Sequence, residues 1–352
     1  MSNLQMGFDR KFGIGIVGCG TIASVHAEAI RNIDNAELFS VYSRDRNNAT
    51  RLGEKFCVPA KDDWEDFIGD DRLDIISVCT PSGTHLDYGE KIAQSGKHVI
   101  VEKPIEVTLE RGKQLIRACE QHDVKLAVIF QNRFIHDIVR MKKSIDEGKL
   151  GKIFLADASV KWFRDQAYYD SAPWRGTVAQ DGGGVLINQA IHTIDLLQWM
   201  LGDVKTIFGQ TGTFTHKRME GEDTAVASLR FQSGALGVIQ ASTSIKPAVN
   251  RRITIHGEKG TAALSGNTFR MTTDDDESSE YTMQEDSRKT GSASPLQNFS
   301  VGPHQRQFEA IFEAIGNDAV PPVSGGESLK SLAVVLSVYE SAKKSAPVEI
   351  QD

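Results

Sequence analysis

Two residues far apart in the sequence have side chains suited to proton transfer. Lys103 ends the apolar run that starts at His98, and His192 lies within a mostly apolar stretch. Burial and neighbouring charges can bring the pKa of a lysine toward the working range, so both side chains could act as general acid or base. The alternative for Lys103 is a solvated surface residue. A cis bond to Pro104 would fix the direction of the lysine.

The stretch that carries His192 has a polar face. At about 100° per residue, Asn188, His192, Asp195 and Trp199 fall within a sector about 60° wide. Buried polar groups need hydrogen-bond partners, so this face must meet a polar network or a ligand. The alternative is a structural histidine in the core, with Asp195 as its partner.

A glycine-rich turn follows the first apolar run, in the sequence Gly18-Cys-Gly20-Thr-Ile-Ala23. Glycines allow a tight turn and a close approach of the backbone, and a following helix N-terminus favours a pyrophosphate. We therefore expect Gly18, Gly20, Thr21 and Ile22 to bind a dinucleotide. The alternative is an ordinary glycine-rich turn.

The end of the second strand bears on which dinucleotide binds. An NAD site usually has an acid about 20 residues after the fingerprint, whereas the 2′-phosphate of NADP needs a cation. Ser43 stands where the acid is expected, and Arg44 follows it. A contact from Arg44 to phosphate is worth roughly 1.5 to 3 kcal/mol, which favours NADP. NAD is the alternative if Asp45 turns inward.

Two more strand ends carry candidate cofactor contacts, because parallel sheets bind ligands at the carboxyl ends of their strands. Thr80, Pro81 and His85 follow one strand, and Glu102 and Lys103 end another. A lone histidine at a helix start, such as His85, is more often structural than catalytic.

An aromatic and arginine-rich loop, residues 161–176, precedes the His192 stretch. Aromatic faces with interleaved polar donors suit a cyclic polyhydroxylated ligand, and they suit an oligomer interface equally well. The substrate-binding candidates are Arg164, Tyr169, Trp174, Arg175, Asn188 and Asp195.

Strands and helices alternate in the first part of the chain. The expected strands are Phe12–Val17, Ala36–Tyr42, Ile75–Cys79, His98–Val101 and Leu126–Ile129, and the amphipathic stretches between them are 21–32, 84–95 and 108–122. Thr84 and Thr108 are expected N-caps. This alternation predicts βαβ units and a parallel sheet, an α/β class.

The pattern changes after Arg133. We expect helices at 135–147 and 185–201, and strands at 152–160, 224–231, 235–242, 251–256 and 261–264. The last four are close in sequence, which suits a largely antiparallel sheet. Residues 272–303 are polar and predict loop and edge structure, and helices at 305–315 and 328–346 close the chain.

Composition narrows the class of protein. The 352 residues carry 40 Lys+Arg and 47 Asp+Glu, a net charge of −7, which disfavours a nucleic-acid partner. The four cysteines have no CxxC spacing, and no motif for a metal site is present, so we expect reduced thiols and no metal. No apolar run predicts a signal peptide or a membrane span. These features indicate a cytoplasmic protein.

Taken together and in this order, the motifs resemble those of the Gfo/Idh/MocA family, named for glucose–fructose oxidoreductase and inositol dehydrogenase. The resemblance covers nearly the whole chain: the glycine fingerprint, Thr80-Pro81 through His85, Glu102-Lys103-Pro104, and Asp181-Gly-Gly-Gly leading to His192. It implies a doubly wound Rossmann domain over residues 1–131. It also implies an α+β domain with an open, largely antiparallel sheet over residues 132–352, through which family members often form dimers or tetramers.

The resemblance implies NAD(P)-dependent oxidation or reduction of a sugar, cyclitol or related cyclic alcohol, with catalytic roles for Lys103 and His192. The family's aspartate, four residues before the histidine, is Asn188 here. An amide can orient an imidazole but cannot stabilise its charged form, so Lys103 or Asp195 would have to compensate. Two rival functions share these motifs: a glycosidase that uses nicotinamide transiently, and a non-catalytic cofactor sensor.

Overall fold

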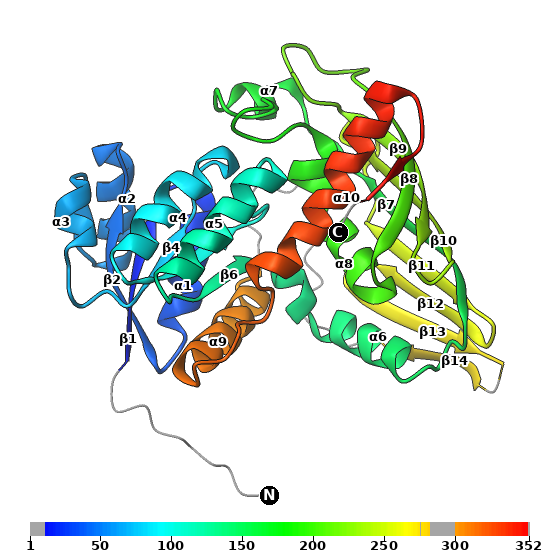
Figure 1. The fold of residues 1–352 in the computed structure, drawn as a ribbon, viewed down its shortest axis with the longest axis horizontal. Helices are drawn as coiled ribbons and strands as arrows, with labels where there is room; N and C mark the ends of the chain where they lie inside the picture. Colours follow the sequence, from blue (N-terminus) through cyan, green and yellow to red (C-terminus); the bar gives the residue numbers. More distant parts are fainter. Residues whose placement is uncertain (1–10, 275, 282–299, 351–352) are drawn as a thin grey trace, which may run out of the picture.

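The computed structural model describes residues 11–274, 276–281 and 300–350. The chain builds two sheets, each with its own helices, and Figure 1 shows them side by side. The first sheet precedes the second in the sequence, as expected.

The first sheet has six parallel strands in the order β3-β2-β1-β4-β5-β6. They are β1 (Phe12–Val17), β2 (Ala36–Tyr42), β3 (Ala60–Lys61), β4 (Ile75–Val78), β5 (His98–Glu102) and β6 (Leu126–Ile129). The order reverses beside β1, so the carboxyl ends of β1 and β4 border the crevice where such sheets bind ligands. The predicted Rossmann topology is confirmed.

Helices connect these strands: α1 (Thr21–Arg31), α2 (Arg46–Phe56), α3 (Trp64–Ile68), the short 3₁₀ turn η1 (Ser82–Thr84), α4 (His85–Gln94) and α5 (Leu109–Gln121). Thr108 caps α5 as predicted, since its hydroxyl accepts a hydrogen bond from the Arg111 amide. The prediction that Thr84 caps α4 is wrong. The chain enters α4 through η1, and the Thr84 hydroxyl donates to the Pro81 carbonyl instead.

The second sheet has nine strands in the order β14-β13-β12-β11-β7-β10-β9-β8-β15. They are β7 (Ile153–Lys161), β8 (Val204–Gly212), β9 (Thr224–Phe231), β10 (Leu236–Ser242), β11 (Arg252–Gly257), β12 (Gly260–Ser265), β13 (Thr268–Thr273), β14 (Asp276–Tyr281) and β15 (Val348–Glu349). Every pairing is antiparallel except β7 with β10, which confirms the predicted sheet type.

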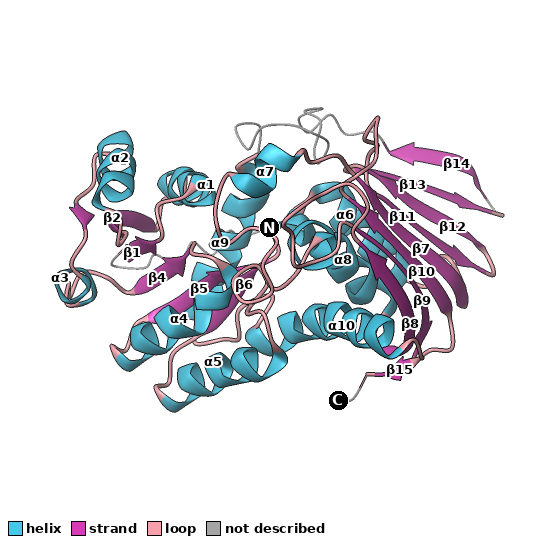
Figure 2. Cartoon of the chain, turned by 90° about the horizontal axis from the view of Figure 1, so that it is seen from above, coloured by secondary structure: helices cyan, strands magenta, loops and turns pink. Residues whose placement is uncertain are grey.

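Helices cover one face of this sheet. Figure 2 shows α6 (His136–Asp146), α8 (Ile191–Leu201) and α10 (Gly325–Lys344) on the side that faces the first sheet. No helix of the described residues is long and apolar enough to cross a membrane. Of the stretch predicted as loop and edge, β13 and β14 take the first part, and residues 282–299 lie outside the described residues.

The helix expected at 185–201 is two elements. Val185–Ala190 forms the π-helix η3, and α8 starts at Ile191. The backbone amides at the start of η3 are bound by one residue: Glu222 accepts from Gly184 and Leu186 through its carboxylate and from Val185 through its carbonyl. π-helical turns are frequently found at functional sites.

The chain returns to the first sheet after completing the second. Helix α9 (Gly302–Gly316) packs against α1, beside it in Figure 1, and against the short η2 (Gln131–Phe134). Its Phe308 and Ile311 belong to the same buried cluster as Ile14 and Ile30. The expected boundary at residue 131 therefore lies between the two sheets, but α9, from the far side of that boundary, packs into the core of the first sheet.

Candidate active site

The glycine turn after β1 leaves room for a ligand. Gly18 has φ of 89°, and a Cβ there would lie 2.9 Å from the Cys79 carbonyl. At Gly20, which precedes the first residue of α1, a Cβ would meet no protein atom within 4 Å. A phosphate could therefore reach the backbone and the helix N-terminus at Thr21 and Ile22, so the turn fits a dinucleotide.

The end of β2 presents Ser43 and Arg44, as predicted. Asp45 does not turn inward: its carboxylate caps α2 by accepting hydrogen bonds from the amides of Asn47 and Asn48. Arg44 is exposed and forms no ion pair with any described residue. The geometry thus leaves a cation, rather than a carboxylate, free at this strand end.

Lys103 leaves β5 toward the second sheet. The Lys103–Pro104 bond is cis, and the ammonium Nζ donates a 2.8 Å hydrogen bond to the backbone carbonyl of Asn188 in η3. Burial lowers the pKa of Lys103 from its usual value, against the opposing charges of Glu102 and Asp181. The ammonium is therefore held at the π-helix, in a setting that eases loss of its proton.

His192 lies in α8, four residues after Asn188, whose carbonyl binds that ammonium. Burial, followed by the positive charge of Lys103, lowers the pKa of His192 well below its usual value, so the ring is neutral near pH 7. The Phe130 ring meets the imidazole edge to face at 5.6 Å between centroids. Nδ1 is buried and has no hydrogen-bond partner among the described residues. That Lys103 and His192 act together stays a prediction, and the hydrogen bond to Asn188 brings the lysine to the segment directly before His192.

Asp195 is engaged elsewhere, which corrects two expectations about it. Nε and Nη2 of Arg133 donate to its two oxygens, each at 2.7 Å, and the carboxylate is 1% exposed. Asp195 is therefore neither the partner of His192 nor available to a substrate. The predicted face assumed a regular α-helix from residue 185, and the π-turn breaks that spacing.

Asn188 does not orient the imidazole. Its side-chain amide donates to Asp181 and accepts from Gln189. Asp181 is 2% exposed, and its second oxygen accepts from the Gly176 amide. Burial raises the pKa of this carboxyl, against the charge of Lys103, which lowers it. A buried carboxylate thus lies one hydrogen bond away from Asn188, and sequence reasoning gave Asp181 no role.

Gln189 connects Asn188 to the aromatic loop. Its Nε2 donates to Asn188 Oδ1 and to the Tyr168 hydroxyl, and its Oε1 accepts from Arg164 at 3.1 Å. Sequence reasoning missed Gln189 because a glutamine in an apolar helix carries no spacing signal. The loop candidate Tyr169 is buried, and its hydroxyl is hydrogen-bonded to that of Thr243. Tyr168, not Tyr169, is therefore the tyrosine that joins this network. Trp174 and Arg175 are half-buried in the same loop.

The expectation that His85 contacts a cofactor is wrong. The ring is fully buried, and its nitrogens lie 3.1 and 2.9 Å from the backbone carbonyls of Thr80 and Pro104. His85 therefore holds together the two loops that follow β4 and β5. Thr80 and Pro81 stay partly exposed beside the glycine turn, where the Thr80 methyl would lie 2.9 Å from a Cβ at Gly18.

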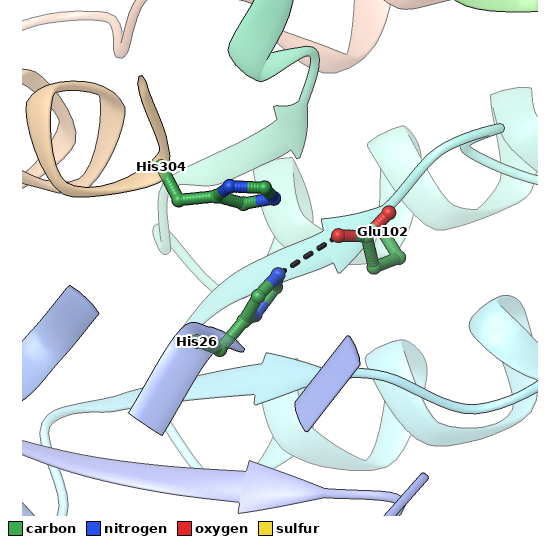
Figure 3. A group of neighbouring side chains, drawn as sticks. All are labelled: His26, Glu102 and His304. Carbon is green, nitrogen blue, oxygen red and sulfur yellow. Dashed lines mark hydrogen bonds and ion pairs between the residues drawn. The ribbon is translucent and has the colours of Figure 1, made fainter. Parts of the chain in front are cut away.

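Glu102 points away from the crevice and into the first domain, contrary to its expected cofactor contact. In Figure 3 it meets His26 of α1 below His304 of α9, and the His26–Glu102 hydrogen bond is 2.8 Å. Burial disfavours the charged carboxylate, but His26 outweighs it and lowers the pKa of Glu102 to about 2. These three residues have ligand-type atoms within 4.8 Å of one another. Because Glu102 and His26 already satisfy each other directly, we assign no ion to them.

Two family models match the chain in succession. The model described as an oxidoreductase family with an NAD-binding Rossmann fold matches residues 12–130, and the GFO/IDH/MocA C-terminal domain matches residues 138–263.

Relatives of known activity match both halves. Myo-inositol 2-dehydrogenase of Thermotoga maritima is 30% identical over 70% of this chain and 73% of its own. The NADP-dependent scyllo-inositol 2-dehydrogenase of Bacillus subtilis is 26% identical over 96% of each chain. Among solved structures, the WlbA dehydrogenase of Bordetella pertussis, in complex with NADH and UDP-GlcNAcA, is 32% identical, with a TM-score of 0.84 over 97% of this chain and 100% of its own.

Proposed function

The chain belongs to the Gfo/Idh/MocA family of NAD-binding oxidoreductases, and from that premise we propose that it transfers a hydride between a nicotinamide and the carbinol carbon of a sugar, cyclitol or related cyclic alcohol. Lys103 and His192 handle the proton of the substrate hydroxyl. The observation that carries the proposal is the hydrogen bond from Lys103 Nζ to Asn188 O, which joins the end of β5 to the π-helix η3, directly before the helix of His192.

Each protein group has one task in this proposal. When bound, the nicotinamide supplies or accepts the hydride. The Asn188 carbonyl holds the Lys103 ammonium in one direction, and burial lowers the pKa of that group, so it can give or take the hydroxyl proton. The neutral His192 beside it can accept a proton. Asp181 and Gln189 fix the Asn188 amide from both ends, so the site is held in place before substrate arrives.

Absorbance of the reduced nicotinamide tests the proposal. The panel contains myo-inositol, scyllo-inositol and UDP-GlcNAcA, because these compounds appear with the relatives, together with neutral cyclic sugars. A dehydrogenase converts cofactor in step with substrate. Substrate cleavage without net cofactor change would indicate the glycosidase, and cofactor binding with no turnover on any compound would indicate the sensor.

We propose NADP as the preferred cofactor, because Arg44 is free at the end of β2 while Asp45 is occupied as a helix cap. The relatives include both an NADP-dependent enzyme and an NADH complex. Fluorescence titration of NADPH and NADH decides between them. We expect Arg44→Gln to weaken NADPH roughly 10- to 100-fold and NADH little. Equal affinities of the wild type for both cofactors would remove the role of Arg44.

We further propose that the protein forms a homodimer or homotetramer through the uncovered face of the second sheet. Leu155, Phe208, Val226 and Leu236 are 40–46% exposed on that face, and strand register puts Leu155 beside Leu236. Sedimentation velocity tests the proposal: a monomeric wild type would contradict it, and the double variant Leu155→Lys/Val226→Lys should dissociate the assembly.

A further inference from the structure

Two arginines of the aromatic loop stack their guanidinium groups on the same tyrosine ring. The Arg164 guanidinium carbon lies 5.4 Å from the centroid of Tyr168, and that of Arg175 lies 4.4 Å from it. Arg164 also stacks on Trp162 and Arg175 on Trp174. Such cation–π contacts hold both groups without neutralising their charge.

Neither arginine has an ion-pair partner. No carboxylate in the described part of the chain comes within 4.0 Å of either guanidinium. Arg164 donates to the Phe163 carbonyl and to Gln189, and Arg175 donates to the hydroxyls of Ser171 and Tyr168. All four acceptors are neutral.

Two arginines elsewhere in the fold differ in this respect. Arg111 reaches two carboxylates and Arg133 reaches two, so each is neutralised within the fold. The buried carboxylate of Asp181, which accepts from Gly176 in the same loop, already has both oxygens engaged, by Gly176 and Asn188. The charge of the loop arginines is therefore left for a group that is not part of the chain.

The two arginines border the proposed reaction site. Arg175 donates to the Tyr168 hydroxyl, and that hydroxyl also accepts from Gln189. Gln189 in turn donates to Asn188, whose backbone carbonyl binds Lys103. Arg164 is joined to Asn188 through Gln189. An anion bound by the arginines would thus border the hydrogen-bonded network that ends at the Lys103 ammonium.

From these contacts we propose that Arg164 and Arg175 form an anion-binding subsite for the substrate. The planar, forked donors of arginine match the oxygens of a carboxylate or phosphate. The proposal rests on the function proposed above and names its substrate class: an acidic derivative of a cyclic sugar or cyclitol, with the anionic group held by the loop and a ring hydroxyl at Lys103.

Binding to the cofactor-loaded protein tests the subsite apart from catalysis. The probes are D-glucuronate, D-glucose 6-phosphate and D-glucose, which share a ring and differ in the anionic group, and the readout is tryptophan fluorescence at Trp162 and Trp174. We expect at least one anionic probe to bind about 10- to 100-fold more tightly than glucose. The stronger of the two identifies carboxylate or phosphate as the preferred group. Equal affinity for all three probes overturns the proposal.

Single variants assign the effect to the two arginines. Arg164→Gln and Arg175→Gln should each remove most of the preference for the anion and leave glucose binding little changed, whereas Arg175→Lys should keep part of it. Arg31→Gln is the matched control. Like the loop arginines, Arg31 stacks on an aromatic ring, that of Phe56, but it lies in α1, in the first domain. A preference that survives in both glutamine variants overturns the proposal, and thermal unfolding checks that each variant is folded.

Two further results separate this proposal from the proposed function. NADPH affinity should be unchanged in both glutamine variants. A lower NADPH affinity would show that the arginines bind a phosphate of the cofactor, and it would overturn the proposed substrate subsite. Anion binding that depends on the arginines, together with no hydride transfer to any compound, would leave the subsite standing and remove the dehydrogenase function.

Discussion

At the scale of single residues, Lys103 is the group on which the proposed chemistry depends. General acid–base catalysis contributes roughly 10²- to 10⁴-fold, so we expect Lys103→Ala to lower turnover at least about 10²-fold. NADPH affinity, measured by fluorescence, should stay within a few-fold, because the glycine turn is untouched. Lys91→Ala, at an exposed lysine of α4 stacked on Trp64, is the control. Near-normal turnover of the Lys103 variant would remove this lysine from the reaction.

Asp181 should set the pH at which Lys103 works. Its negative charge raises the pKa of the lysine, so Asp181→Asn should lower that pKa and move the Lys103 limb of the kcat profile to lower pH. The double variant Asp181→Asn/Asn188→Asp exchanges the carboxylate and the amide of this hydrogen-bonded pair. We expect it to move the Lys103 limb of the kcat profile part of the way back to its wild-type pH. A profile that does not move in the single variant would show that Asp181 has only a structural role.

The site could be predicted where a residue type alone implies chemistry. Lys103 and His192 stood out as proton-transfer groups, and the glycine turn stood out by its spacing. Gln189 and Asp181 were missed because their importance lies in what they bind across the fold. Asp195 was misassigned because the helix was taken as regular, and the π-turn changed which residues share a face.

At the scale of elements, the π-helix η3 depends on Glu222. Burial raises the pKa of the Glu222 carboxyl from 4.5 to about 7, although the Leu186 and Gly184 amides and Tyr339 oppose the shift. The folded state then holds a proton that the unfolded chain releases between those values. Stability from this group is present below about pH 4.5 and is lost as the pH rises to about 7, by an amount on the order of 3 kcal/mol.

Urea unfolding at pH 5 and pH 8 measures this effect. We expect the free energy of unfolding of Glu222→Gln to change less between the two pH values than that of the wild type. Glu90→Gln, at an exposed glutamate of α4, should behave like the wild type. The same pH dependence in Glu222→Gln and the wild type would refute the assignment.

The elements that sequence patterns predicted are those with an unambiguous apolar signal. The strands of the parallel sheet are buried on both faces, so β1, β2 and β6 appear as apolar runs with their observed bounds. The polar helix α2 and the two-residue strand β3 carry no comparable signal and were not expected. Strand β8 was also missed, since its buried residues are interrupted by exposed polar ones.

At the scale of the whole molecule, α9 ties the end of the chain to the dinucleotide-binding half. Phe308 is fully buried, and its ring meets His26 edge to face at 5.1 Å between centroids. We expect Phe308→Ala to lower the free energy of unfolding by about 3 to 5 kcal/mol, measured by denaturant unfolding. Phe214→Ala is the matched control, because Phe214 is 76% exposed and its loss should cost within about 0.5 kcal/mol. Equal effects of the two variants would show that α9 is not part of this core.

The return of α9 also shows why the division of the chain was harder to predict than its sheets. Sheet type follows from local alternation of strands and helices. Helix α9 has an ordinary amphipathic pattern, which gives no indication of whether the first or the second sheet receives its apolar face. Only the three-dimensional arrangement places Phe308 and Ile311 with β1 and α1.

The bond between Lys103 and the Asn188 carbonyl spans 85 residues and both halves of the fold. On the proposed chemistry, a chain whose second half has not yet docked could already bind a dinucleotide at its glycine turn. Its Lys103 ammonium, however, would lack the Asn188 carbonyl that orients it. The reaction would then require the complete tertiary structure, and an incompletely folded or damaged molecule would bind coenzyme without reducing or oxidising it.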